Sequence, residues 1–272
     1  MAAEIIDGQK IDVKIKQRYP QLEFDSLRMY FGEPYVIDLE EIDGSITIYQ
    51  PTIGDMIRVG ENKFHTTLNF LTTNTTACRL MLHQMGKDWN VVSDFELFCL
   101  LYHNIDPEVS KLIFGDLDWS KFKIAQKTDT EGNITWFLVN QEQNIIINES
   151  VYQHFHQYLQ RVFNIFPEEK FTRDPMLKQW WIDQEVRRTE REESKPSSES
   201  SSIQPIISAL VNHPGFKYKL KELKDVGVCE FYDSVKRLQI YEQSTAVLKG
   251  MYSGMISSKD IDPDSYNFMK AI

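Results

Sequence analysis

The sequence predicts a mainly α protein with a small β component, an α+β fold whose helical modules follow an N-terminal strand region and carry a short β-hairpin. Three observations support this fold class. Apolar residues alternate with period two in parts of the first fifty residues, a second alternating pair flanks the turn sequence TDTEGN, and helical spacing dominates elsewhere. Hydrophobic residues make up 42% of the 272 residues, with 16 Phe, 12 Tyr and 5 Trp, so the chain is rich enough in apolar side chains to fold.

The expected strands lie in two regions. Ile11, Val13 and Ile15 alternate with polar residues, and so do Ile46 and Ile48, which follow the turn sequence EIDGS at 41–45. Segments 122–127 and 134–139 form a hairpin whose turn contains Gly132 and Asn133, two residues that tolerate positive φ. Segment 145–147 adds a possible third strand.

Capping residues mark three helices in the first part of the chain. Thr52 and Asp55 form a capping box before one apolar stripe, which runs through Ile53, Met56, Ile57, Phe64, Leu68 and Leu71. Ser93 and Glu96 form a second box, and Pro107 is expected to end that helix and return the chain to strands. Asn148 caps a helix with apolar residues at helical spacing up to Phe166, and Pro167 ends it.

A Ser-rich linker predicts the domain organisation. Residues 194–202 read SKPSSESSS, without one apolar side chain, and we expect them to join an α+β module at 1–193 to a helical module at 203–272. The second module has nine Lys and Arg against eight Asp and Glu, a net charge of +1 out of −10 for the whole chain. Its expected helices are 203–211, 228–248 and a short one after Asp262 and Pro263.

Charge and cysteine content limit the possible functions. A net charge of −10 and a pI near 5.2 argue against nucleic-acid binding, which requires clustered Lys and Arg. No apolar run is long enough to span a membrane, the first fourteen residues lack the apolar core of a signal peptide, and three cysteines fit a reducing compartment. We therefore expect a cytoplasmic protein that contacts neither nucleic acid nor membrane.

The sequence offers no constellation for catalysis, so we expect a non-enzymatic protein without cofactor or metal. It lacks glycine-rich phosphate loops and the GxSxG and HExxH motifs. Cys99 and His103 would share a helix face, but Cys78 and His83 would point in different directions, which argues against a zinc site. His154 and His156 lie on opposite sides of one helix, and we interpret both as surface residues.

Two charged segments have both a functional and a structural interpretation. Asp38, Glu40, Glu41 and Asp43 either bind a cation or basic partner or form a solvated hairpin tip, which we favour. In FKYKLKELK at 216–224 the lysines either contact phosphate or an acidic protein, or point outward while Phe216, Tyr218 and Leu220 point inward, which we also favour.

The most promising partner surface lies near the C-terminus. Segment 250–256 combines two Met, one Tyr and two Gly, which suits an adaptable contact with irregular apolar partners better than an efficient core. The alternative is that Leu248, Met251 and Met255 continue the preceding helix and pack inward. The expected partner-binding residues are Tyr241, Leu248, Met251, Tyr252, Met255 and Ile256.

Two stretches resemble proteins of tailed bacteriophages. Residues 45–106, from SITIYQPTIGDMIRVG to FCLLYHNID, resemble proteins encoded in the tail-morphogenesis region. Residues 228–262, VCEFYDSVKRLQIYEQSTAVLKGMYSGMISSKDID, are similar to the C-terminal part of phage tail assembly chaperones, in which a helix leads into a Gly-x-x-x-Gly segment, here Gly250 to Gly254. The probable strands of the front half depart from that family, whose members are shorter and nearly all helical.

The resemblance implies a tail assembly chaperone of the host cytoplasm. Such a protein would coat the phage tape-measure protein, recruit major tail protein and leave as the tail tube polymerises. The alternative is a virion structural subunit, such as a connector or a baseplate-adjacent protein. A homo-oligomer is compatible with either reading.

Overall fold

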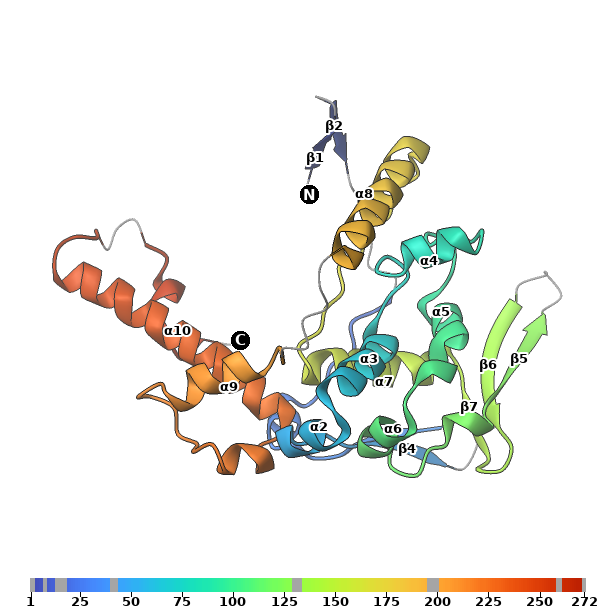
Figure 1. The fold of residues 1–272 in the computed structure, drawn as a ribbon, viewed down its shortest axis with the longest axis horizontal. Coiled ribbons are helices and arrows are strands. Elements are labelled where there is room, and N and C mark those ends of the chain that lie inside the picture. The colour runs from blue at the N-terminus through green and yellow to red at the C-terminus, as the bar shows by residue number, and fades with distance from the viewer. Residues whose placement is uncertain are drawn as a thin grey trace.

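The computed structural model describes residues 3–6, 9–12, 19–39, 44–128, 134–194, 201–257 and 261–270 (Figure 1). The fold is mainly α with a small β component, as the sequence predicts. The helices are α1 Ser26–Tyr30, α2 Ile53–Val59, α3 Glu61–Thr72, α4 Arg79–Gln84, α5 Asp94–Leu101, α6 Pro107–Phe114, α7 Glu149–Val162, α8 Pro175–Glu193, α9 Gln204–Val211 and α10 Val228–Tyr252. Short 3-10 turns cover Tyr102–Asn104, Trp119–Lys121, Glu222–Asp225 and Pro263–Ser265. None of these described helices combines the length and apolar character needed to cross a membrane.

The described strands form three small antiparallel sheets. They pair β1 Ala3–Ile6 with β2 Gln9–Asp12, β3 Tyr35–Asp38 with β4 Ser45–Ile48, and β5 Lys123–Thr128 with β6 Ile134–Asn140 and β7 Ile145–Ile147. The predicted hairpin and its third strand are confirmed. The expected strand residues Val13 and Ile15, the turn residues Gly132 and Asn133, and the acidic residues Glu40, Glu41 and Asp43 lie outside the described residues.

The core is built around α7, which is covered on several sides. Asn148 caps α7 by accepting a hydrogen bond from the Val151 amide, as the sequence predicts. Phe155 is fully buried and meets Phe98 of α5 and Phe114 of α6 edge to face. Such aromatic contacts contribute about 0.5–1.5 kcal/mol each beyond the area they bury. The apolar residues of α7 therefore form the centre of the molecule. The predicted extension of this helix to Phe166 is wrong, because α7 ends at Val162, Asn164 has a φ of 53°, and 64% of the Phe166 surface is exposed.

A smaller cluster fixes the base of α8. Leu177, Trp181 and Ile182 pack against residues of α4 and α5. Arg79 of α4 and Glu185 form a largely buried ion pair with 2.6 Å between their charged atoms. Beyond this pair α8 projects from the body, and its last residues are exposed on every side (Figure 1).

The long helix expected from Thr52 to Leu71 is two helices, α2 and α3. The Thr52–Asp55 capping box is present, but Gly60 has a φ of 96°, a conformation that ends α2 and starts α3 in a new direction. Ile57 lies within α2, whose buried residues are Ile53 and Met56, and 51% of the Ile57 surface is exposed. The prediction that Ile57 belongs to one buried apolar stripe is therefore wrong.

The expected return to strands directly after Pro107 is wrong, because Pro107 starts helix α6. Asp106 accepts hydrogen bonds from the amides of Glu108 and Val109, and Pro107 occupies the first helical position. Proline suits that position because the amide it lacks would have no helical partner. The same arrangement of Asp174 and Pro175 starts α8.

The beginning of the C-terminal segment shares the core of the N-terminal part. Glu61 accepts hydrogen bonds from the amides of Ser202 and Ile203, at 2.7 and 3.0 Å. Ile203 is buried in the cluster that contains α7. Residues 195–200 of the predicted linker lie outside the described residues, so the division at 194–202 stays a prediction.

His156 was expected at the surface, but only 4% of it is exposed. Its Nδ1 lies 2.9 Å from the Leu71 carbonyl oxygen, which can only accept, so Nδ1 carries the proton. Its Nε2 then accepts a hydrogen bond from Gln160 Nε2 at 2.9 Å. The expectation failed because the surrounding elements cover this polar side of α7.

This buried imidazole predicts a pH-dependent stability. Burial lowers the pKa of His156 from 6.5 to about 4, so the unfolded state takes up a proton first as the pH falls. Above pH 6.5 the neutral imidazole leaves the free energy of unfolding at its full value. Between pH 6.5 and pH 4 proton uptake by the unfolded state lowers that free energy by about 3 kcal/mol. The free energy of unfolding, measured with urea at pH 6.5 and at pH 4, should fall less between the two pH values for His156→Gln than for the wild type. Equal differences would contradict this account, and His83→Gln, at an exposed position on α4, is the control.

Candidate partner-binding surface

Four of the six predicted partner-binding residues lie on α10, and Met255 and Ile256 lie in the turn that follows it. The first half of α10 is anchored to the body, and Leu238 still packs against the core. The Val228 amide donates to the Pro51 carbonyl at 3.1 Å, and Val228 and Phe231 are fully buried. A helix of 25 residues is about 37 Å long at 1.5 Å per residue. The rest of α10 projects from the body as an arm, on the side away from the β5–β6–β7 sheet (Figure 1).

The C-terminal tail returns along this arm. Arg237 Nη1 donates to the carbonyl oxygens of Phe268 and Lys270, both at 2.8 Å. The Phe268 ring packs edge to face on Tyr241, with 6.0 Å between ring centroids. Tyr241 is therefore part of the contact that holds the tail, and about half of its surface is covered.

The tip of the arm has a defined turn. Gly254 has a φ of 73°, its amide donates to the Met251 carbonyl, and the Met255 amide donates to the Gly250 carbonyl at 3.0 Å. These two bonds form a Schellman motif, which satisfies the last carbonyls of a helix. Ile256 folds back onto Gly250, where a Cβ atom would overlap Ile256 Cδ1. The two glycines that suggested a flexible stretch thus have definite roles in a compact turn.

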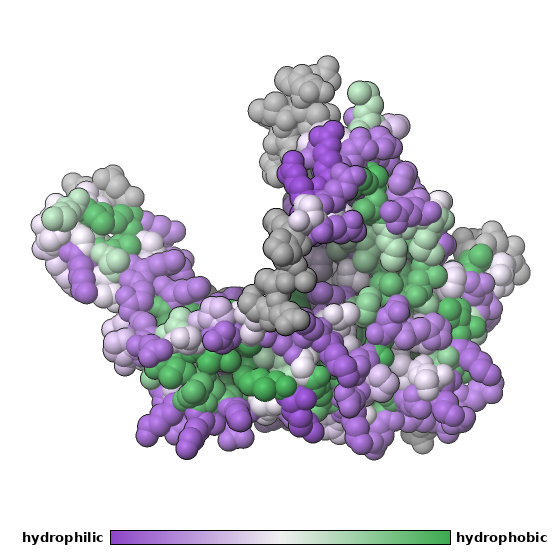
Figure 2. All heavy atoms as spheres, in the orientation of Figure 1, coloured by the Kyte–Doolittle hydropathy of each residue, from purple (hydrophilic) through white to green (hydrophobic). Residues whose placement is uncertain are grey.

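This turn divides the six predicted residues into covered and exposed ones. Tyr252 and Met255 have 86% and 87% of their surfaces exposed. Leu248 and Met251 are half-buried, so the inward-packing alternative applies to them in part but not to Met255. Figure 2 shows hydrophobic side chains at the end of the arm. We call Tyr252 and Met255 the tip pair.

Sequence reasoning missed Phe268, whose contact with Tyr241 depends on the path of the tail. No local spacing connects residues 27 positions apart. The available signal was the group of large side chains Tyr266, Phe268 and Met269 in the tail.

Cys99 and His103, the candidate metal ligands from the sequence, each pack against other side chains of the fold. Cys99 is fully buried, which raises the pKa of its thiol to about 12, and His103 packs on the neighbouring Tyr102 ring. Within the described ranges, no group of three or more His, Cys, Asp or Glu side chains gathers as a metal site would require.

The basic segment at 216–224 is only partly as expected. Phe216 and Tyr218 pack against the core, and Lys217 pairs with Glu230 at 3.2 Å. Leu220, expected to point inward, has 60% of its surface exposed. The alternation fails there because the chain is irregular before the 3-10 turn at Glu222 and forms no strand.

The turn at the tip predicts a local effect of Gly254→Ala. An alanine at a positive φ costs about 1 kcal/mol or more, so the two turn hydrogen bonds should open more often. Hydrogen exchange of the Met255 and Ile256 amides should accelerate about fivefold, while the core amides of α7 keep their protection. Lys249→Ala, at an exposed helical position of α10, is the control. Unchanged exchange in Gly254→Ala would show that the turn does not depend on glycine.

Comparison with known proteins gives a match for the C-terminal part. Residues 194–272 match the model of a domain family described as YomV second domain, which is phage-derived. The match covers the last 79 residues of 272 and includes the whole of α10 and its tail. No curated protein and no solved structure matches the chain. The C-terminal part therefore resembles a phage-associated domain.

Proposed function

We propose that this protein is a bacteriophage tail assembly chaperone that acts without catalysis in the host cytoplasm. It binds the tape-measure protein through the tip pair of α10 and recruits major tail protein to the growing tube. The phage-derived family match over 194–272 supports a phage protein and covers the proposed binding arm. The resemblance of residues 228–262 to tail assembly chaperones supports the narrower role.

One observation carries the proposal, namely the two large side chains left exposed at the free end of an anchored arm. Each would gain about 25 cal/mol for every Å² of apolar surface buried against a partner. Methionine adapts to irregular apolar surfaces, and tyrosine adds a hydroxyl that tolerates a wet rim. A chaperone needs such adaptable contacts and no chemistry.

A virion structural subunit is the second candidate. The order of the arm favours it, because Arg237 and Tyr241 hold the returning tail and the tip is closed by a defined turn. A subunit of a connector or baseplate uses a fixed projection to contact a neighbour. The two candidates differ in whether the protein stays in the particle.

The exposed tip pair predicts a separation of binding from stability. Tyr252→Asp combined with Met255→Asp places two charges where the partner would bury apolar surface, so binding of tape-measure protein should weaken at least 100-fold. The melting temperature should stay within about 2 °C of the wild type, because both side chains are already exposed. Co-purification from infected cells and thermal unfolding are the two measurements.

A matched control adds the same charge elsewhere on the arm. Gln243→Asp combined with Ala246→Asp changes two exposed positions of α10, and this variant should bind like the wild type. If the tip variant binds normally, the tip pair is not the binding surface. If both variants lose binding equally, added negative charge is responsible and the proposed contact is wrong.

Purified particles discriminate between the two functions. A chaperone should be missing from mature virions and should co-purify with tape-measure protein from infected cells. Quantitative mass spectrometry of virions tests this expectation. A stoichiometric amount in the particle would favour the structural subunit.

A further inference from the structure

One edge of the β3–β4 sheet has free hydrogen-bonding groups. The Leu39 amide donates to the Gly44 carbonyl at 3.0 Å, and Ile46 and Ile48 lie opposite Ile37 and Tyr35. Antiparallel pairs alternate between residues that bond to each other and residues that point away. The amides and carbonyls of Ser45 and Thr47 therefore point away from β3.

The next residue of this series confirms the alternation. The Tyr49 amide also points away from β3, and it donates to the Ile113 carbonyl in the last turn of α6 at 2.7 Å. Helix α6 thus closes one end of the β4 edge. In the part of the chain that the structure describes, Ser45 and Thr47 have no backbone partner on the free side.

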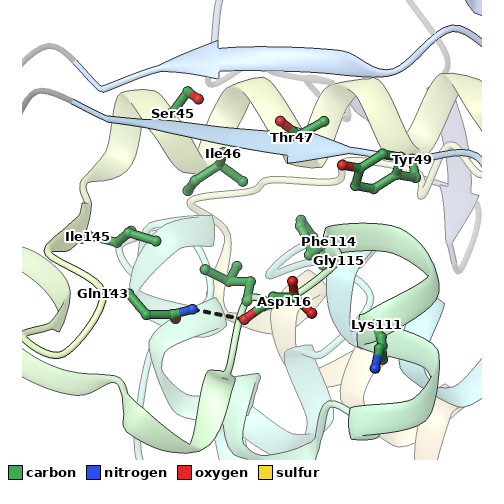
Figure 3. A pocket seen from close by; sticks show the side chains of 11 residues that line it. Ser45, Ile46, Thr47, Tyr49, Lys111, Phe114, Gly115, Asp116, Gln143 and Ile145 are labelled. Carbon is green, nitrogen blue, oxygen red and sulfur yellow. Dashed lines mark hydrogen bonds between the residues drawn. The ribbon is translucent and has the colours of Figure 1, made fainter.

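A pocket of about 500 Å³ lies along this free edge. Figure 3 shows β4 on one side of it, with β3 beyond, and Phe114, Asp116, Gln143 and Ile145 on the other side. Gln143 Nε2 donates to the Asp116 carbonyl at 2.8 Å and so ties the β6–β7 connection to the end of α6. This hydrogen bond therefore holds together the wall opposite β4. The volume of the pocket is within the range of ligand sites.

We propose that this pocket binds one extended peptide segment of a partner protein, which adds to the β4 edge as a third strand. Ser45 and Thr47 present donors and acceptors two residues apart, the spacing at which an extended strand presents its own. Ile145 is partly exposed and lines the pocket beside the buried Phe114 and Leu117, so it offers apolar surface to a side chain of that strand. A compact small molecule would leave this repeat of backbone groups unmatched.

Charge complementarity further limits which peptide sequences fit the pocket. Lys111 of α6 lines the pocket on the side opposite β4 and makes no ion pair within the described residues (Figure 3). A strand bound along β4 therefore carries an acidic residue at the end that reaches Lys111. This site is separate from the tip pair and does not depend on the chaperone proposal.

The test uses a synthetic peptide on the full chain. The probe is acetyl-Val-Thr-Val-Thr-Val-Glu-amide, titrated to millimolar concentration while ¹⁵N NMR follows the backbone amides. The Ser45 and Thr47 amides should shift and exchange their hydrogens at least fivefold more slowly, and the tip variant should respond in the same way. Absence of these changes would overturn the proposal. Shifts confined to the Lys111 region would indicate ionic contact without strand addition and would also overturn it.

Two variants test the mode of binding. Thr47→Pro removes an outward amide and leaves the bonds to β3 in place, so it should weaken the peptide at least tenfold. If that variant does not fold, Lys111→Glu serves instead: it should weaken the Glu-ended peptide and strengthen a Lys-ended one, while Lys219→Glu, at an exposed position elsewhere, should change neither. A peptide N-methylated on alternate amides should lose binding when the methyl groups face β4 and keep it in the other phase. Equal binding of both phases would contradict strand addition.

Discussion

A junction between two distant chain segments supports the arrangement of the whole molecule. The Ile53 amide donates to the Val226 carbonyl and the Val228 amide donates to the Pro51 carbonyl, so the starts of α2 and α10 hold each other. The segments approach closely because residue 54 is glycine; a Cβ there would lie 2.6 Å from the Lys224 carbonyl oxygen. Phe231 then enters the core one turn later. The direction of the α10 arm is therefore set at its base.

The residues that stabilise the arm and the residues exposed at its end are different ones. The base is buried with the core, and the returning tail covers the middle through Arg237 and Phe268, so the tip contributes little to folding. Large apolar side chains on a free surface favour aggregation unless they have a use. Their position at the end of a supported projection, surrounded by polar residues, fits a protein that contacts other chains.

Local signals explain how much of this fold the sequence predicts. Thr52, Ser93 and Asn148 each cap a helix as expected, because a cap depends only on residues three positions apart. From sequence alone, Pro107 predicts the end of a helix, although Asp followed by Pro equally begins one, as Asp106 and Pro107 do here. The burial of His156 depends on carbonyl and amide partners from its surroundings, which no spacing along α7 reveals. At the arm, composition pointed to the segment that contains the tip pair, while the contact of Tyr241 depends on the path of the tail and that of Ile256 on the turn at Gly254.

The β4 edge and the tip pair lie on opposite sides of the molecule, one beside the β6–β7 connection and the other at the end of α10 (Figure 1). By our two proposals, the β4 edge would recognise the backbone of an extended segment, and the tip pair would bury apolar side chains without a fixed geometry. Two weak contacts on one molecule would raise the overall affinity for a long client, because the second contact forms at the high effective concentration that the first creates. Each contact also releases separately, so a client held in this way is displaced in steps when a stronger partner binds it. The two surfaces keep a fixed separation only if the arm is joined firmly to the core, and the hydrogen bonds at residues 51–53 and 226–228 make that join.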